Sequence, residues 1–356
     1  MLSFFQKSLV GLDIGTHSIK LVELDVAKDS YRLKNFGMAK LPKETIVNGV
    51  IINAEPVIQS IKNLIANLKI TNKNAAVSIS GHPVIIKKIT IPQMDGTELE
   101  QSIETESEQY IPYDIDEVNL DYQMLDVNPE ESDKMDVMLV AAKKANIEEY
   151  MGLIKSTGLN AKIVDIDVFA LENMFYLNYE DEIEEEEIDA LIDIGASLSN
   201  INILKNDLSI FNRDVPLAGN QITEDIQKEL SVSFEEAETL KTGEEIEGIS
   251  QDQIDEIINK ASLTVVREIQ RTLDFFVGGN YGEINKIFLS GGGAKTRGLK
   301  DLLAEKMDIP VEFTDPFKRI KYDKKTFDPE YIRDISLITS VGVGLAWRQI
   351  GDKDEE

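Results

Sequence analysis

Residues 10–16, Val-Gly-Leu-Asp-Ile-Gly-Thr, and residues 191–197, Leu-Ile-Asp-Ile-Gly-Ala-Ser, present the same pattern twice. Each copy is an apolar strand that ends in Asp-x-Gly and is followed by hydroxyl side chains. The glycine lets a phosphate oxygen approach the backbone, because a Cβ there would block the contact. The Asp can hold a water of a hydrated Mg²⁺ ion, which takes few protein carboxylates. The repeat therefore predicts two half-molecules that close around one nucleotide.

Length and charge restrict the partners of the chain. With 356 residues it is long enough for two lobes, since single cores stop growing near about 250 to 300 residues. It contains 37 Lys and Arg against 65 Asp and Glu, a net charge of −28. This charge argues against nucleic acid or an anionic lipid surface as a partner. A phosphate ligand must therefore arrive with a cation.

Cysteine content and the chain ends bear on location. Cysteine is absent, which is compatible with a cytosolic protein. Residues 1–8 are too short for a signal peptide, and no apolar run of about 18 residues occurs elsewhere. The tail 351–356 is too polar to insert as an amphipathic helix. We therefore expect no direct membrane insertion, so a partner would have to hold the protein at a membrane.

Hydrophobic periodicity divides the rest of the chain. The first Asp-x-Gly turn lies in a predicted β-hairpin over 9–25. Between 83 and 161 the order strand, helix, strand, strand, helix indicates an inserted small α+β subdomain. The acidic run 180–187 is typical of a solvated connector. After the second hairpin, helices are expected at 221–230, 233–242, 251–276 and 335–350.

Three segments can contact a nucleotide. In the first, Thr16 and Ser18 can donate to phosphate oxygens and Lys20 can reach back from the partner strand, although alone Lys20 also fits an exposed strand charge. The second turn is lined by Ser197, Ser199 and Asn200. The third is a glycine run between strand and helix, where the backbone can lie against ribose or base, or form a bare turn: Gly291, Gly292 and Gly293. The P-loop and Gly-x-Gly-x-x-Gly motifs are absent, which argues against those two kinds of site.

The order of hairpin, inserted subdomain, second hairpin, helical insert and triple-glycine turn resembles the actin and sugar-kinase ATPase superfamily. More narrowly, the chain resembles the PilM family of type IV pilus assembly proteins, which is similar to the cell-division protein FtsA. The segments that carry the resemblance are 8–24, 193–202, 219–223, 267–276, 289–294 and 315–317. The resemblance implies an α/β, two-lobed actin-like fold, also called ribonuclease H-like, with an FtsA-like subdomain 1C inserted.

The resemblance also implies a division into four parts. Lobe 1 (1A) would comprise 1–82, 162–187 and 335–356, and subdomain 1C would comprise 83–161. Lobe 2 (2A) would comprise 188–220 and 283–334, with a helical subdomain 2B at 221–282.

The family's site residues carry over by position. Asp13 and Asp193 would hold Mg²⁺ through water, and Asp167 would orient the attacking water. The two phosphate segments would be Asp13, Gly15, Thr16, Ser18 and Lys20, and Asp193, Gly195, Ala196 and Ser197. The three glycines 291–293 would border the adenosine of ATP. Glu238 and Lys241 would bracket ribose and base, although three residues apart they also fit a solvated helix face.

Some positions depart from the family pattern. Leu198 replaces a usual hydroxyl, and Ala218 replaces a usual glycine before Gly219. Asp167 is shorter than the Glu of vigorous ATPases and also fits a helix cap, so we expect ATP binding with at most slow hydrolysis. Of the two histidines, His17 is expected to face solvent and His82 to end a strand, and neither indicates a zinc site.

The resemblance implies a cytoplasmic ATP-binding scaffold of type IV pilus assembly, held at the inner membrane by the N-terminal tail of a PilN-like bitopic protein. Nucleotide would close the cleft and change a tail-binding groove between lobe 1 and the inserted subdomain. Other machine components and self-association are further possible partners. Two alternatives stay open. A filament former like FtsA would need a C-terminal membrane helix, and a small-molecule kinase would need a general base and a substrate floor. The single Trp347 disfavours such a floor.

Overall fold

The computed structural model describes residues 8–27, 30–81, 83–127, 133–184, 186–206, 208–279 and 281–350. The expectations for His82, for the tail 351–356 and for nearly all of 1–8 lie outside these residues. Within the described ranges, no helix is long and apolar enough to cross a membrane.

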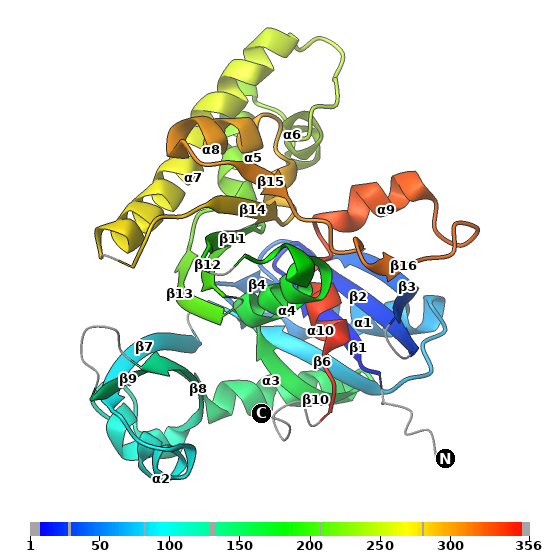
Figure 1. Cartoon of the computed structure of the whole chain (residues 1–356). Helices are drawn as coiled ribbons and strands as arrows, with labels where there is room; N and C mark the ends of the chain where they lie inside the picture. The colour runs from blue at the N-terminus through cyan, green and yellow to red at the C-terminus, as the bar shows by residue number, and fades with distance from the viewer. Residues whose placement is uncertain are drawn as a thin grey trace.

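Two mixed sheets, each built around one copy of the repeated hairpin, form the body of the molecule (Figure 1). The first contains β1 (Val10–Ile14), β2 (Ser18–Ala27), β3 (Ser30–Lys40), β6 (Asn74–Ile79), β10 (Asn160–Ile166) and β16 (Ile320–Lys321). The second contains β11 (Ile188–Ile194), β12 (Ser199–Lys205), β13 (Leu208–Val215), β14 (Lys286–Ser290) and β15 (Val311–Phe313). Their strand orders are β10-β6-β1-β2-β3-β16 and β13-β12-β11-β14-β15.

The predicted duplication is confirmed in the strand pairing. β1 pairs antiparallel with β2 and parallel with β6. In the same way, β11 pairs antiparallel with β12 and parallel with β14. Each Asp-x-Gly turn therefore lies at the same edge of its sheet, next to the carboxyl end of a parallel neighbour.

Helices α4 (Asp167–Tyr179) and α10 (Ser340–Trp347) lie at the centre of the molecule and share a core with both sheets (Figure 1). The Phe175 ring of α4 meets Phe288 of β14 edge-on, with centroids 4.7 Å apart. A Cβ at Gly344 would lie 1.7 Å from the Ala170 carbonyl oxygen, so α10 packs closely on α4 as its small residues predict. The expected single helix over 335–350 is wrong, because α9 (Pro329–Ser336) ends before α10 begins.

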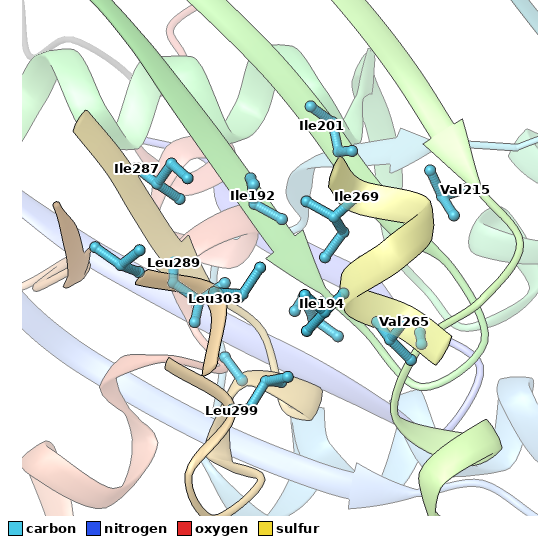
Figure 2. Close-up of a cluster of buried hydrophobic side chains, with 14 of the residues drawn as sticks. Ile192, Ile194, Ile201, Val215, Val265, Ile269, Ile287, Leu289, Leu299 and Leu303 are labelled. Atoms are coloured by element: carbon cyan, nitrogen blue, oxygen red, sulfur yellow. The ribbon is translucent and has the colours of Figure 1, made fainter. Parts of the chain in front are cut away.

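The other face of the second sheet is covered by α7 (Gln251–Gly278) and α8 (Leu299–Met307) (Figure 2). The apolar residues of α7 recur every three or four positions, so one face of the helix packs on the sheet. Figure 2 shows Val265 and Ile269 of α7 beside Ile192 and Ile194 of β11. Two shorter helices, α5 (Gly219–Leu230) and α6 (Phe234–Lys241), complete this lobe.

The element order predicted for 83–161 is confirmed. It consists of β7 (Val84–Pro92), α2 (Gly96–Ser107), β8 (Val118–Val127), β9 (Lys134–Lys143) and α3 (Lys144–Ser156), with a 3-10 turn at Ile115–Glu117. The sheet order is β7-β9-β8, all antiparallel. This sheet has its own core with α2, whereas Leu153 and Ile154 of α3 pack into the core of the first sheet with α1 (Ala54–Asn67).

One expected boundary is wrong. Residues 283–334 were expected in the second lobe, but β16 pairs in parallel with β3 at the edge of the first sheet. Helix α9 stays on that side, where the Tyr331 ring lies 6.1 Å from Phe36. Arg319 also forms ion pairs with Glu180 and Asp181 of the acidic run. The rest of the division into 1A, 1C, 2A and 2B stays a prediction.

Candidate functional site

The two Asp-x-Gly turns have the same hydrogen bond. The Gly15 N–H donates to the Ser18 carbonyl oxygen at 3.1 Å, and the Gly195 N–H donates to the Leu198 carbonyl oxygen at 3.0 Å. A Cβ at Gly195 would lie 2.9 Å from that oxygen, so the turn requires glycine there. Leu198 contributes its backbone carbonyl oxygen to this turn, so the turn does not need a hydroxyl side chain at that position.

Lys20 reaches back over the first turn. It lies opposite Asp13 in the β1–β2 ladder, and its Nζ is 3.1 Å from Asp13 Oδ2. A Cβ placed on Gly15 would be 3.2 Å from the same Nζ. The Lys20 side chain is 15% exposed, so the alternative of an exposed strand charge is wrong. Thr16 is half-buried, and Ser18 is buried at the start of β2.

Asp13, Asp167 and Asp193, which come from both lobes, lie close enough for the charge of Asp13 to act on the other two carboxyls, and we call them the carboxylate cluster. Burial, and then the charge of Asp13, raises the pKa of Asp167 to about 7, while hydroxyl hydrogen bonds from Ser78 and Ser80 oppose the rise. Burial raises the pKa of Asp193 to about 6, the Ser290 hydrogen bond opposes this, and the charge of Asp13 adds to it. The Ser78 Oγ–Asp167 Oδ1 distance is 2.5 Å and the Ser290 Oγ–Asp193 Oδ1 distance is 2.7 Å.

The structure thus brings together the three acids that were predicted to be catalytic, while their roles stay predictions. Asp167 is the first residue of α4, after the cap position at Ile166, and its Oδ1 accepts from Ser78 Oγ, so Asp167 is not the helix cap. Among the described residues, no group of three or more His, Cys, Asp or Glu side chains is arranged to hold a metal ion.

The second turn is held by hydrogen bonds from the start of α5. The Gly219 N–H donates to the Gly195 carbonyl oxygen at 3.1 Å, and the Asn220 N–H donates to the Ala196 carbonyl oxygen at 2.7 Å. Asn220 Nδ2 also donates to Ser197 Oγ at 3.1 Å. Ala218, where a glycine was expected, has an extended backbone that any residue can adopt, with φ −158°.

The glycines of the third segment differ in their surroundings. A Cβ at Gly291, which has φ +91°, would lie 2.3 Å from the Ile194 carbonyl oxygen. A Cβ at Gly293 would lie 2.8 Å from the Gly195 carbonyl oxygen. At Gly292 the nearest atom is Ile338 Cγ2 at 3.7 Å. Gly291 and Gly293 therefore allow the glycine run to pack on the second turn, whereas Gly292 is exposed and a Cβ there would make only an ordinary contact.

Lys241 is buried, so the solvated-face alternative is wrong for it. Its Nζ lies 2.5 Å from Glu238 Oε1 and donates to Thr223 Oγ1 at 2.8 Å and to the Gly219 carbonyl oxygen at 3.4 Å. Burial lowers the pKa of Lys241, and the Glu238 charge opposes that shift. Glu238 keeps 30% of its side chain exposed. Lys241 thus fixes α6 and Glu238 to the start of α5, beside the second turn.

Several contacts cross between the lobes. Asp214 of β13 accepts from the Gly81 N–H of the first lobe at 2.9 Å, and within its own sheet it accepts from Asn200 Nδ2 at 2.7 Å. Lys43 Nζ lies 3.7 Å from the centroid of the Phe234 ring on α6. His17 was expected to face solvent but is half-buried, and burial lowers its pKa against the effect of Glu238.

Sequence reasoning missed Ser78, Ser80 and Tyr150, which surround Asp167. The signal available was the pair of hydroxyls in Ser78-Ile79-Ser80, at the carboxyl end of the parallel strand β6. Ligands bind at the carboxyl ends of strands in open α/β sheets. No comparable signal marks Tyr150, which reaches the cluster from α3.

A second concave site lies in the inserted subdomain. A pocket of about 530 Å³ is formed by the end of α2 and the loop that leads to β8. Apolar and aromatic groups, among them Ile111 and Tyr113, share its lining with four acids: Glu104, Glu108, Asp114 and Asp116. The surface of the pocket is mainly polar and acidic, which suits a positively charged segment.

The family model of the type IV pilus assembly protein PilM matches residues 11–350. The solved structure of a PilM–PilN type IV pilus biogenesis complex has a TM-score of 0.84 at 26% sequence identity, over 96% of this chain and 98% of that chain.

More distant proteins share the fold. MreB5 of Spiroplasma citri, solved with ADP bound, has a TM-score of 0.54 at 13% identity, over 99% of this chain and 98% of that chain. The cell division protein FtsA of Bacillus subtilis is 24% identical over 259 residues, which cover 65% of this chain. The match spans 57% of the length of that FtsA. The two-lobed actin-like fold predicted from the sequence is confirmed.

Proposed function

The chain belongs to the PilM family of type IV pilus assembly proteins, and from this premise we propose that it is an actin-like, nucleotide-dependent scaffold of the pilus machine. It holds Mg²⁺-ATP between its lobes, and it binds the cytoplasmic N-terminal tail of a PilN-type inner-membrane protein. The proposal depends on the carboxylate cluster of Asp13, Asp167 and Asp193 and on the two Asp-x-Gly turns beside it, which share the same hydrogen bond. Buried like charges favour a bound cation, because it removes their repulsion.

The residues of the cleft fit a triphosphate with its cation. Thr16 and Ser197 place hydroxyls on opposite turns, and Lys20 supplies a positive charge over Gly15. Asp13 and Asp193 would hold the waters of Mg²⁺, which supplies charge neutralisation when bound. The open side of Gly292 and the exposed part of Glu238 suit the adenosine, with Lys241 positioning Glu238.

Asp167 suits a weak hydrolytic role. A pKa of about 7 lies near neutral pH and suits a group that accepts a proton from water, but the Asp167 side chain is one methylene shorter than the Glu of vigorous ATPases and reaches less far toward that water. Its link to Ser78 also fixes its side chain on the first lobe. Slow ATP hydrolysis follows, and nucleotide serves mainly to hold the lobes together.

The acidic pocket suits the partner's tail. Cytoplasmic segments that flank membrane helices carry an excess of Lys and Arg. Glu104, Glu108, Asp114 and Asp116 would meet such charges, while Ile111 and Tyr113 would contact apolar side chains. This pocket lies within the inserted subdomain, and not between the subdomain and lobe 1, where the groove was expected. It is next to the junction with the first lobe at α3, where Lys143 Nζ is 3.9 Å from the Tyr113 ring centroid.

The test is calorimetric titration with a synthetic peptide of the N-terminal tail of the same organism's PilN, in Mg²⁺-ATP. The peptide should bind the wild type, and a Glu104→Gln/Glu108→Gln variant should bind it roughly five- to tenfold more weakly, because two charge contacts are lost. The matched control is Glu148→Gln/Glu149→Gln, which removes two exposed charges of α3. Absence of binding to the wild type contradicts the proposal. Sedimentable polymer in Mg²⁺-ATP without peptide binding would favour the FtsA-like alternative.

A further inference from the structure

Tyr150 links helix α3 to the carboxylate cluster. Its hydroxyl donates to the Ser78 carbonyl oxygen at 3.1 Å, and Ser78 Oγ donates to Asp167 Oδ1 at 2.5 Å. The ring packs against the core of the first sheet. Burial, and then the charges of Asp167 and Asp13, raise the pKa of Tyr150, so the hydroxyl keeps its proton and remains a donor at neutral pH.

The start of the same helix contacts the acidic pocket. Lys144 Nζ donates to the Asp116 carbonyl oxygen at 2.9 Å, and Lys143 lies over the Tyr113 ring. Asp116 and Tyr113 both line the pocket. Residues 144 and 150 are six positions apart on one helix, which is about 9 Å along its axis. A single helix therefore contacts both candidate sites.

No connecting residue separates α3 from the inserted sheet. β9 ends at Lys143 and α3 begins at Lys144. β9 is the central strand of the order β7-β9-β8. Because strand and helix follow each other directly in the chain, a shift of α3 against the first sheet acts on the central strand of the inserted sheet without an intervening loop.

We propose that α3 couples the nucleotide cleft to the acidic pocket, with Tyr150 as the positioning residue that links the helix to Asp167 through Ser78. The inference rests on the proposed function, because it needs both a nucleotide and a tail. Binding of Mg²⁺-ATP changes the charge around Asp167, and the Asp167–Ser78–Tyr150 chain passes that change to the helix. Coupling of this kind is reciprocal, so the tail strengthens nucleotide binding by the same factor.

The test measures the coupling factor, defined as the ratio of peptide Kd without nucleotide to peptide Kd with Mg²⁺-ATP. The wild type should give a factor of about five or more. Tyr150→Phe keeps the ring and removes the hydroxyl, and it should lower the factor by roughly two- to tenfold, the value of one hydrogen bond. Peptide Kd without nucleotide and nucleotide Kd without peptide should stay within about twofold of wild type. Tyr331→Phe, on α9 and 43% exposed, is the matched control and should keep the full factor.

The outcomes separate the inference from the proposed function. An unchanged factor in Tyr150→Phe overturns the inference and leaves the scaffold intact. A wild-type factor of one, with clear binding of both ligands, also overturns it. A wild type that binds no tail peptide overturns the proposed function and the inference together. Circular dichroism melting curves establish that each variant is folded before the titration.

Discussion

Asp13 and Lys20 face each other across the first hairpin, with Lys20 Nζ 3.1 Å from Asp13 Oδ2. At the equivalent positions of the second hairpin, Asp193 faces Asn200. The first hairpin therefore supplies a positive charge that the second lacks, although the two turns have the same geometry. In the proposed nucleotide site, Lys20 of the first lobe would therefore be the residue that neutralises phosphate charge.

Loss of the Lys20 charge should weaken nucleotide binding. We expect Lys20→Met to raise the Kd for Mg²⁺-ATP by at least about tenfold, because a charge-assisted contact contributes about 1.5 to 3 kcal/mol. The matched control is Lys34→Met, which removes another cross-strand ion pair, to Glu23 at 3.0 Å, away from the turns. Fluorescent nucleotide titration measures both. Equal affinity in Lys20→Met and wild type would remove Lys20 from the site.

The glycines of the third segment should separate packing from ligand contact. Gly293→Ala places a Cβ 2.8 Å from the Gly195 carbonyl oxygen, so we expect the free energy of unfolding to fall by about 1 to 3 kcal/mol. Gly292→Ala meets nothing closer than 3.7 Å, so it should leave stability unchanged while weakening ATP binding. Urea denaturation and nucleotide titration of both variants check this. The reverse order of destabilisation would contradict the packing.

The raised pKa of Asp167 should make stability depend on pH. The folded protein binds the Asp167 proton more tightly than the unfolded chain does. The bound proton therefore stabilises the fold fully below about pH 4, and this stabilisation is lost as pH rises to about 7. Asp167→Asn should therefore gain about 1 to 3 kcal/mol over wild type between pH 5 and pH 8. Urea denaturation without nucleotide, in EDTA, measures this. Asp25→Asn, an exposed carboxyl of β2, is the control, and parallel pH profiles for Asp167→Asn and wild type would contradict the prediction.

The Lys241–Glu238 pair should be energetically coupled. Lys241 is 4% exposed, so removing Glu238 leaves a poorly solvated ammonium charge. A double-mutant cycle of Lys241→Met and Glu238→Gln should give an interaction energy of about 1 to 3 kcal/mol by urea denaturation. The exposed pair Lys260–Glu229, at 3.2 Å, should give about 0.5 kcal/mol or less in the same cycle. Equal values for the two pairs would refute a structural role for Lys241.

Much of the fold could be predicted because its signals are local. The two Asp-x-Gly turns and the alternation of 83–161 specify hairpins and an insert without knowledge of distant contacts. The pairing of β16 with β3 could not be predicted, because two residues carry no periodicity and the partner lies far away in sequence. The break between α9 and α10 was hidden by continuous apolar residues.

The candidate site was predictable only in its motif residues. Asp13, Asp167 and Asp193 lie at or next to strand ends, which the repeated motif and the strand pattern predict. Burial of Lys241 and the reach of Tyr150 depend on how α6 and α3 pack, which no local spacing encodes. The different surroundings of Gly292 and its neighbours likewise arise from the approach of the second turn.

The central claim is that one nucleotide is held jointly by both lobes. Calorimetric titration of Mg²⁺-ATP into the wild type, Asp13→Asn and Asp193→Asn tests it most directly. We predict one nucleotide per chain in the wild type, and a Kd at least about tenfold higher in each variant, because each removes one half of the same clamp. Two nucleotides per chain, or wild-type affinity in either variant, would contradict the claim.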